Sequence, residues 1–256
     1  MLVPEFTELT WTIRPSLDEW AEVAAFELPG VGGEPLAKGD PKELDRELVV
    51  KRGLREVDDH GWDHFFIAAD GWAIATAARI AQMREEAVAG MVLGHATLSF
   101  RRDGERAPIN GPVWDAMNQL LSQDHEAFIR HGIAQSSGRS ISEDLAQQMI
   151  DRFPRDLMLL GWERVTADDE FGDLLKGLDC PMLLAKHEGC LMSTDEGFED
   201  AVAALPGAKT IAVPDAPSTS PDFARAMRKF CEERWHSEGA APPRSSGEPL
   251  SRTPDT

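Results

Sequence analysis

Asp70 and His95 are the residues whose types and positions best suit them for chemistry. Asp70 directly follows the apolar run Phe65–Ala69, and Gly71 after it is typical of a turn. The alanine-rich segment Ala73–Ala81 then has the composition of a closely packed helix. A strand, one polar residue at a tight turn and a helix present a reactive side chain at the top of a parallel sheet. Asp70 is therefore a candidate nucleophile, and a structural helix cap is the alternative, because Asp is a favoured N-cap residue.

His95 is the candidate base. It follows the apolar run Ala87–Leu93, which predicts the next strand along the chain. The carboxyl ends of neighbouring parallel strands adjoin, so we expect His95 to face the same cleft as Asp70. Imidazole exchanges its proton near neutral pH, as a general base must. The alternative is a loop histidine that is simply hydrogen-bonded.

A second polar group, formed by Lys186, His187, Glu188 and Cys190, follows a later apolar run. A metal site would require another cluster of ligands, and the sequence alone does not reveal one. The three cysteines also show no C-x-x-C spacing. We therefore expect a solvated loop here, with no metal and no cofactor.

The apolar runs predict an α/β fold. Strands are expected over residues 9–13, 22–28, 65–69, 87–93, 180–185 and 208–213, and helices over 41–59, 73–81, 194–205 and from 220 onward. Strands that alternate with helices predict a mainly parallel sheet flanked by helices on both faces.

Between residues 101 and 176 the strand signals stop and apolar residues recur at helical spacing. We interpret this segment as a helical cap, inserted into an α/β core of residues 1–100 and 177–236. Ligands bind at the carboxyl ends of the strands in such sheets, so the cap is expected to cover a pocket. Residues 237–256 lack the apolar content needed to fold and are expected to be a disordered tail.

Composition narrows the possible partners. The chain has 256 residues and a net charge of −19, which argues against nucleic acid or an anionic membrane as a partner. The N-terminus has no signal-peptide pattern, and no apolar run is long enough to span a bilayer. We expect a cytoplasmic protein whose partner is a small-molecule ligand or substrate, and the sequence leaves the oligomeric state open.

Five segments, in order, resemble the α/β-hydrolase fold family over about residues 9–235. W-A-E-V-A-A-F-E-L-P-G-V-G-G-E-P is similar to the strand that ends in D-L-P-G-x-G-x-S, and I-A-A-D-G-W-A resembles the elbow G-x-[S/D]-x-G-G. The family's next strand is similar to A-V-A-G-M-V-L. Its late strand is similar to L-K-G-L-D-C-P-M-L-L-A-K-H-E-G-C, and its final turn is similar to I-A-V-P-D-A-P-S. The Asp at the elbow resembles the epoxide-hydrolase and haloalkane-dehalogenase branches.

The resemblance implies a degenerate catalytic triad. Asp70 takes the nucleophile position, Cys190 the position of the acid and Ser218 the position of the histidine base. It also implies that pocket residues are found among Arg14, Gly71, Trp72 and Trp114.

Two functions remain open at this point. In the first, the protein has lost hydrolysis and binds a small apolar molecule, or performs non-hydrolytic chemistry, in the pocket under the cap. This is favoured because the loss of triad members costs orders of magnitude in rate. In the second, it is an active ester, epoxide or carbon–halogen hydrolase that uses Asp70 as nucleophile and His95 as a non-standard base.

Overall fold

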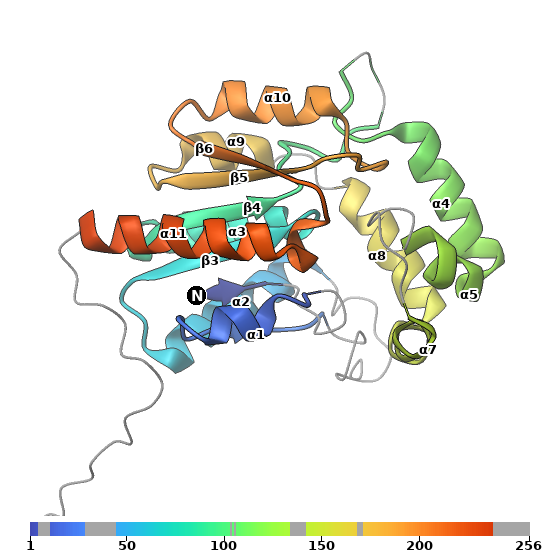
Figure 1. Ribbon diagram of the computed structural model, residues 1–256, viewed down its shortest axis with the longest axis horizontal. Helices are drawn as coiled ribbons and strands as arrows, with labels where there is room; N and C mark the ends of the chain where they lie inside the picture. The colour runs from blue at the N-terminus through green and yellow to red at the C-terminus, as the bar shows by residue number, and fades with distance from the viewer. Residues whose placement is uncertain are drawn as a thin grey trace, which may run out of the picture.

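The computed structural model describes residues 1–4, 11–28, 45–102, 104, 106–133, 142–167 and 171–237. Its centre is a six-stranded sheet in the order β2-β1-β3-β4-β5-β6, and every neighbouring pair is parallel (Figure 1). The strands are β1 (Leu2–Val3), β2 (Ala24–Ala25), β3 (Phe65–Asp70), β4 (Val88–Gly94), β5 (Met182–His187) and β6 (Lys209–Val213). The predicted mainly parallel α/β sheet is confirmed.

Helices cover both faces of this sheet. On one face α2 (Arg46–His60), α3 (Ala73–Met83) and α9 (Phe171–Gly177) pack together, and α3 lies against β3. On the other, α11 (Pro221–Ser237) lies in front of the sheet in Figure 1 and contacts β4, β5, β6 and α1 (Arg14–Asp18). The predicted tail lies outside the described residues apart from Ser237, which ends α11.

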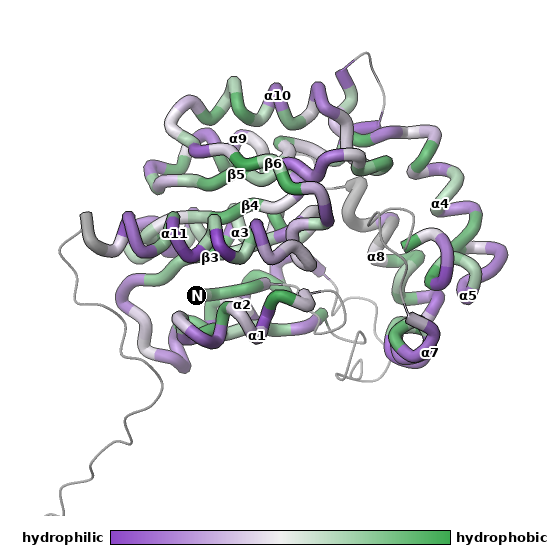
Figure 2. Tube along the Cα trace, viewed as in Figure 1, coloured by the Kyte–Doolittle hydropathy of each residue, from purple (hydrophilic) through white to green (hydrophobic). Residues whose placement is uncertain are grey.

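Alternating side chains of β3 enter two separate hydrophobic clusters. Phe65, Ile67 and Ala69 join the cluster beneath α2 and α3, whereas Phe66 and Ala68 join the cluster beneath α11. Successive side chains of a strand point to opposite faces, so a strand covered on both sides is apolar throughout. Figure 2 shows this as continuous hydrophobic colour along the central strands.

The structure corrects the prediction of a strand over residues 9–13. Trp11–Ile13 form a turn that leads into α1, and residues 9 and 10 lie outside the described part of the chain. Pro15 stands in the first turn of α1, where its missing N–H costs nothing. The strand that fills this place in the sheet is β1, and its two residues are too few to give a period-two pattern.

The chain between β4 and β5 is mainly helical where it is described. It forms α4 (Gly111–Gln123), α5 (His125–Ala127), the π-helix η4 (Phe128–Ile133), α7 (Glu143–Arg152), α8 (Arg155–Ala167) and α9. Helices α4, α5, α7 and α8 gather beside one end of the sheet (Figure 1). Trp114 of α4, Phe128 of η4 and Met149 of α7 are buried and belong to the same hydrophobic cluster as Ile67 of β3.

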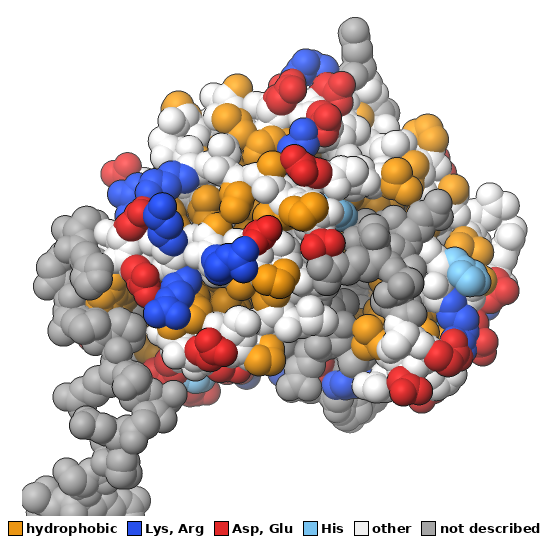
Figure 3. All heavy atoms as spheres, viewed as in Figure 1, with side chains coloured by type: hydrophobic (Ala, Val, Ile, Leu, Met, Phe, Trp, Pro, Cys, Tyr) orange, Lys and Arg blue, Asp and Glu red, His pale blue; other side chains and the backbone are white. Residues whose placement is uncertain are grey.

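None of the helices in the described ranges combines the length and the apolar character needed to cross a bilayer. Acidic and basic side chains are interspersed on the face that carries α11 (Figure 3). Within α11, for example, Arg228 lies 2.8 Å from Glu232. Such exposed pairs contribute little to stability.

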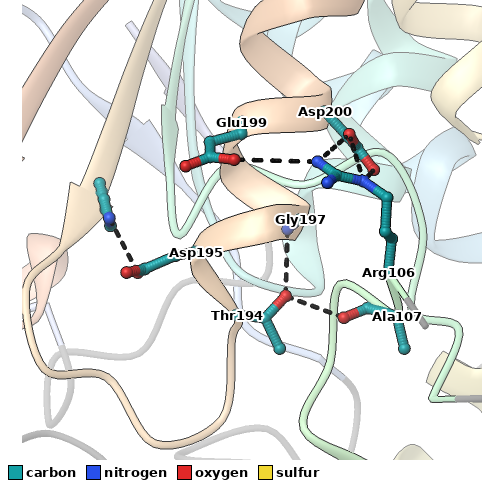
Figure 4. A network of polar contacts seen from close by, with 8 residues as sticks. Arg106, Ala107, Thr194, Asp195, Gly197, Glu199 and Asp200 are labelled. Carbon is teal, nitrogen blue, oxygen red and sulfur yellow. Dashed lines mark hydrogen bonds and ion pairs between the residues drawn. The ribbon is translucent and has the colours of Figure 1, made fainter.

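The start of helix α10 (Asp195–Ala204) is hydrogen-bonded to segment 106–110, which precedes α4. The Thr194 hydroxyl accepts a hydrogen bond from the Gly197 N–H at 3.0 Å and donates one to the Ala107 carbonyl at 2.8 Å (Figure 4). Arg106 lies 2.7 Å from Asp200 on the same helix. The N-cap of α10 therefore also ties two distant parts of the chain together.

Thr194→Ala removes both hydrogen bonds of the hydroxyl. We expect it to lower the free energy of unfolding by about 1–2 kcal/mol, the usual cost of losing an N-cap. Thr194→Ser keeps the hydroxyl and is the matched control, with a loss well below that of the alanine variant. Urea denaturation of the three proteins measures the difference, and equal stability of Thr194→Ala and wild type would contradict the assignment.

Candidate functional site

A carboxylate–imidazole pair lies at the carboxyl ends of β3 and β4. Asp70 Oδ1 is 2.6 Å from His95 Nδ1, and Asp70 Oδ2 accepts a hydrogen bond from the Ser218 backbone N–H at 3.3 Å. The side chains of Asp70 and His95 are only 12% and 20% exposed. Both oxygens of this largely buried carboxylate are therefore engaged, one by an imidazole and one by the backbone.

Local backbone geometry brings these two side chains together. Asp70 pairs in register with Gly94, and a Cβ on Gly94 would lie 2.6 Å from Asp70 Oδ1. Glycine at this position therefore leaves the space that the carboxylate fills. His95 follows with φ 46° and is the only non-glycine residue of the described chain with a left-handed backbone. Such strain persists where surrounding contacts hold it in place, and it clusters at functional sites.

The tip of the strand-to-helix turn carries no side chain. Asp70 is the last residue of β3, and the left-handed residue that makes the turn is Gly71, with φ 57°. The Gly71 N–H donates to the Gly94 carbonyl at 3.1 Å. A residue at such a tip would project its side chain from the sheet, whereas Asp70 turns toward His95 on the neighbouring strand.

His187 and Cys190 complete the cluster. His187 ends β5, is buried, and places Nδ1 3.1 Å from His95 Nε2, with the two rings edge to face. The chain then turns at Gly189, with φ 76°, and the Cys190 N–H donates to the His187 carbonyl at 3.4 Å. One nitrogen from each histidine and the Cys190 sulfur all lie within 4.8 Å of one another.

Each member of the cluster changes the protonation of its neighbours. Burial would lower the pKa of His95, but the Asp70 carboxylate raises it to about 10. Burial would likewise raise the pKa of Asp70, yet His95 and Ser218 hold it below its ordinary value. Burial would raise the pKa of the Cys190 thiol, but hydrogen bonds to His187 and His95 lower it to about 4. The arrangement favours a thiolate beside a protonated imidazole.

The segment that follows Cys190 contacts the residues just before α4. The Asn110 N–H donates to the Met192 carbonyl at 2.8 Å, and Ile109 forms an isolated bridge with Ser193. Next to His95 and His187 is a cavity of about 10 Å³, whose wall includes Ser193 and Thr194. A cavity of this size has room for about one water molecule or one ion.

The structure thus brings together five of the residues that the sequence singled out: Asp70, His95, His187, Cys190 and the backbone of Ser218. The catalytic roles predicted for Asp70 and His95 stay predictions. No metal site was expected, because no second ligand cluster was visible in the sequence. In the structure one nitrogen of His95 lies within 4.8 Å of the Cys190 sulfur and of one nitrogen of His187, and the expectation of no metal site stays a prediction.

Three of the predicted pocket residues have their described contacts or positions elsewhere in the fold. Arg14 forms an ion pair with Asp18 on its own helix at 2.8 Å. Trp114 is buried in the core of the cap helices, and Trp72 is 40% exposed at the start of α3. Gly71, the fourth, forms the turn beside Asp70.

His187 is one of the four residues that the sequence analysis placed in a solvated loop, together with Lys186, Glu188 and Cys190. It ends a strand, as Asp70 does, and its strand β5 neighbours β4. The signal was available, because side chains at the carboxyl ends of adjacent parallel strands meet at one edge of the sheet.

Comparisons of the whole chain give similarity in structure only. No protein-family model matches the sequence, and no curated protein matches it either. A bromoperoxidase from Bacillus anthracis superposes with a TM-score of 0.74 at 12% identity, covering 90% of each chain. A hydrolase from Oleispira antarctica gives a TM-score of 0.73 at 11% identity, also over 90% of each chain. A loop variant of a haloalkane dehalogenase from Bradyrhizobium elkanii gives 0.72 at 15% identity, over 93% of this chain and 89% of that one.

Gly94→Ala tests the packing of the carboxylate. The new methyl group would lie 2.6 Å from Asp70 Oδ1 and 2.7 Å from the Pro217 Cβ, so Asp70 must move away from His95. We expect a loss of about 1–3 kcal/mol in the free energy of unfolding, as is usual for overpacking. Gly161→Ala is the control, because a Cβ there meets nothing within 4 Å and alanine favours its helix. A Gly94→Ala variant as stable as wild type would contradict the tight fit.

Thiol alkylation at pH 6 tests the electrostatics of the cluster. Cys190, with a pKa of about 4, is a thiolate at this pH, whereas burial raises the pKa of Cys180 to about 11 and that of Cys231 to about 12. Only the thiolate is nucleophilic, so iodoacetamide should modify Cys190 and spare the other two. Peptide mass mapping of chelator-treated protein measures each site. Equal modification of Cys180 and Cys190 would contradict the assignment.

Proposed function

We propose that this chain, which has the α/β-hydrolase fold, uses Cys190 as its nucleophile, His95 as general acid and base, and Asp70 to orient His95. The observation that carries the proposal is the 2.6 Å contact between Asp70 and His95, whose imidazole has a nitrogen within 4.8 Å of the Cys190 sulfur. A nucleophile, a base and a residue that orients the base are the parts that covalent catalysis requires. The reaction proposed is hydrolysis of an activated ester or thioester.

The contacts of Asp70 support an orienting role over a nucleophilic one. Each of its oxygens already accepts a hydrogen bond, and the side chain is only 12% exposed. A nucleophilic carboxylate must instead present a free oxygen to the substrate. The turn that would display such a group ends in Gly71, which has no side chain. These contacts support Cys190, in the turn after β5, as the nucleophile rather than Asp70 at the end of β3.

The proposed steps are those of acyl transfer. The Cys190 thiolate attacks the carbonyl carbon, the carbonyl π bond opens, and the negative charge passes to oxygen. When the carbonyl re-forms, the bond to the alcohol or thiol breaks, and protonated His95 supplies the proton to the leaving group. His95 then takes a proton from water, which attacks the resulting thioester. Acid is released, and the Cys190 thiolate and protonated His95 are regenerated.

The two functions left open by the sequence are outcomes of the same test. An active hydrolase that uses Asp70 would form its covalent intermediate on Asp70. A protein that only binds a small apolar molecule under the cap would form none. The proposal differs from both: it replaces the non-hydrolytic chemistry expected from a degenerate triad with slow hydrolysis at the Cys190 thiol.

The test is to mix metal-free protein with a short-chain aryl ester and follow intact mass and product release. We expect a transient acyl adduct on Cys190 and slow turnover. Cys190→Ala should lose the adduct and reduce turnover at least ~100-fold, as the removal of a nucleophile does. Asp70→Asn should form the adduct more slowly, because His95 loses its orienting partner. Cys180→Ala is the matched control and should behave as wild type.

An adduct mapped to Asp70 would overturn the proposal in favour of the Asp70 nucleophile. The absence of any adduct, with a folded protein by circular dichroism, would overturn it in favour of a binding role. Turnover that survives Cys190→Ala would also contradict it.

A further inference from the structure

We infer that His95 Nε2, His187 Nδ1 and the Cys190 sulfur bind a zinc-class divalent cation. The inference goes beyond the proposed function, and metal binding does not require any thiol chemistry. It rests on where three donor atoms from two distant segments of the chain meet.

The first argument is distance. His95 Nε2 and His187 Nδ1 are 3.1 Å apart, and the Cys190 sulfur lies within 4.8 Å of one nitrogen of each ring. Two nitrogens bound to one zinc ion at about 2.0–2.1 Å and a tetrahedral angle lie roughly 3.4 Å apart. The two imidazoles already stand near that spacing, so small side-chain adjustments would complete the site.

The second argument is the identity of the donors. Two imidazole nitrogens and one thiolate form the ligand type that prefers zinc or a similar thiophilic ion over magnesium or calcium. Three protein ligands leave a fourth position for water, which is the pattern of accessible rather than purely structural zinc sites. The cavity of about 10 Å³ next to His95 and His187 has room for one such molecule.

The third argument is the carboxylate behind His95. Asp70 Oδ1 accepts a hydrogen bond from the Nδ1–H of His95, so a metal ion that displaces the other ring proton would bind at Nε2, which lies 3.1 Å from His187 Nδ1. A carboxylate that holds the far side of a metal-bound histidine is a regular feature of zinc sites, and it raises the basicity of the ligand. Asp70 is therefore a positioning residue for the metal and does not bind it.

A bound cation would control the thiol site. The sulfur lone pair that attacks an acyl carbon is the one that a metal ion would occupy, and His95 cannot accept a proton at Nε2 while that nitrogen is a ligand. The metal-bound protein should therefore be inactive as a thiol hydrolase, and removal of the ion should restore activity.

The experiment titrates chelator-treated, reduced protein with Co²⁺, whose absorption reports its ligands. We expect one Co²⁺ per chain, a thiolate-to-cobalt charge-transfer band, and displacement of Co²⁺ by one equivalent of Zn²⁺. Cys190→Ala should abolish the band, and Asp70→Asn should weaken Zn²⁺ affinity about 10–100-fold. The controls Cys180→Ala and His125→Ala alter a cysteine and a histidine outside the cluster and should bind as wild type.

A folded wild-type protein that gives no charge-transfer band would overturn the inference, as would a band that survives Cys190→Ala. His187 is buried, so circular dichroism must show that His187→Ala is folded before its metal binding is measured. His95→Asn replaces the more exposed ligand and should also abolish Co²⁺ binding. Alkylation and ester turnover are measured on metal-free protein. Metal binding without thiol reactivity therefore refutes only the proposed function, and reactivity without metal binding refutes only this inference.

Discussion

The hydrogen-bonded pair of Asp70 and His95 is the interaction on which the rest of the site depends. It joins the ends of two neighbouring strands through two largely buried groups. Charges in such surroundings are tolerated when they are paired, and removal of one partner leaves the other uncompensated. The pair also directs the second imidazole nitrogen toward His187 and Cys190. Both the proposed catalysis and the proposed metal binding depend on this orientation of the His95 ring.

The parallel sheet explains why these residues meet. β3, β4 and β5 are adjacent and end at one edge, where they supply Asp70, His95 just beyond β4, and His187. The turn at Gly189 then brings Cys190 back beside His187. Each strand end thus provides one polar group to a small volume, which is the usual way in which an α/β sheet builds a site.

The sequence allowed β3 to β6 to be predicted to within two residues at each end, because strands buried on both faces are unbroken apolar runs. β1 was missed, since a strand of two residues has no detectable period. The meeting of Asp70 with His95 followed from strand order alone. The predicted strand ended at residue 185, so His187 was assigned to a loop, although its place at the end of β5 beside β4 could have been inferred from strand order. Strand order could not give the direction of its side chain, which depends on register and on the following turn.

The hydrophobic cluster that runs from Ile67 in the sheet to Trp114 and Phe128 in the cap helices has a mechanical consequence. Two parts that share one continuous apolar core cannot separate without exposing it to water, at a cost that grows with the area exposed. The cap helices and the sheet should therefore lose their structure in a single cooperative transition, rather than as independent units. Motions that admit a ligand must then come from the loops between the elements, since rotation of the cap as a rigid body would break the core that holds the strands.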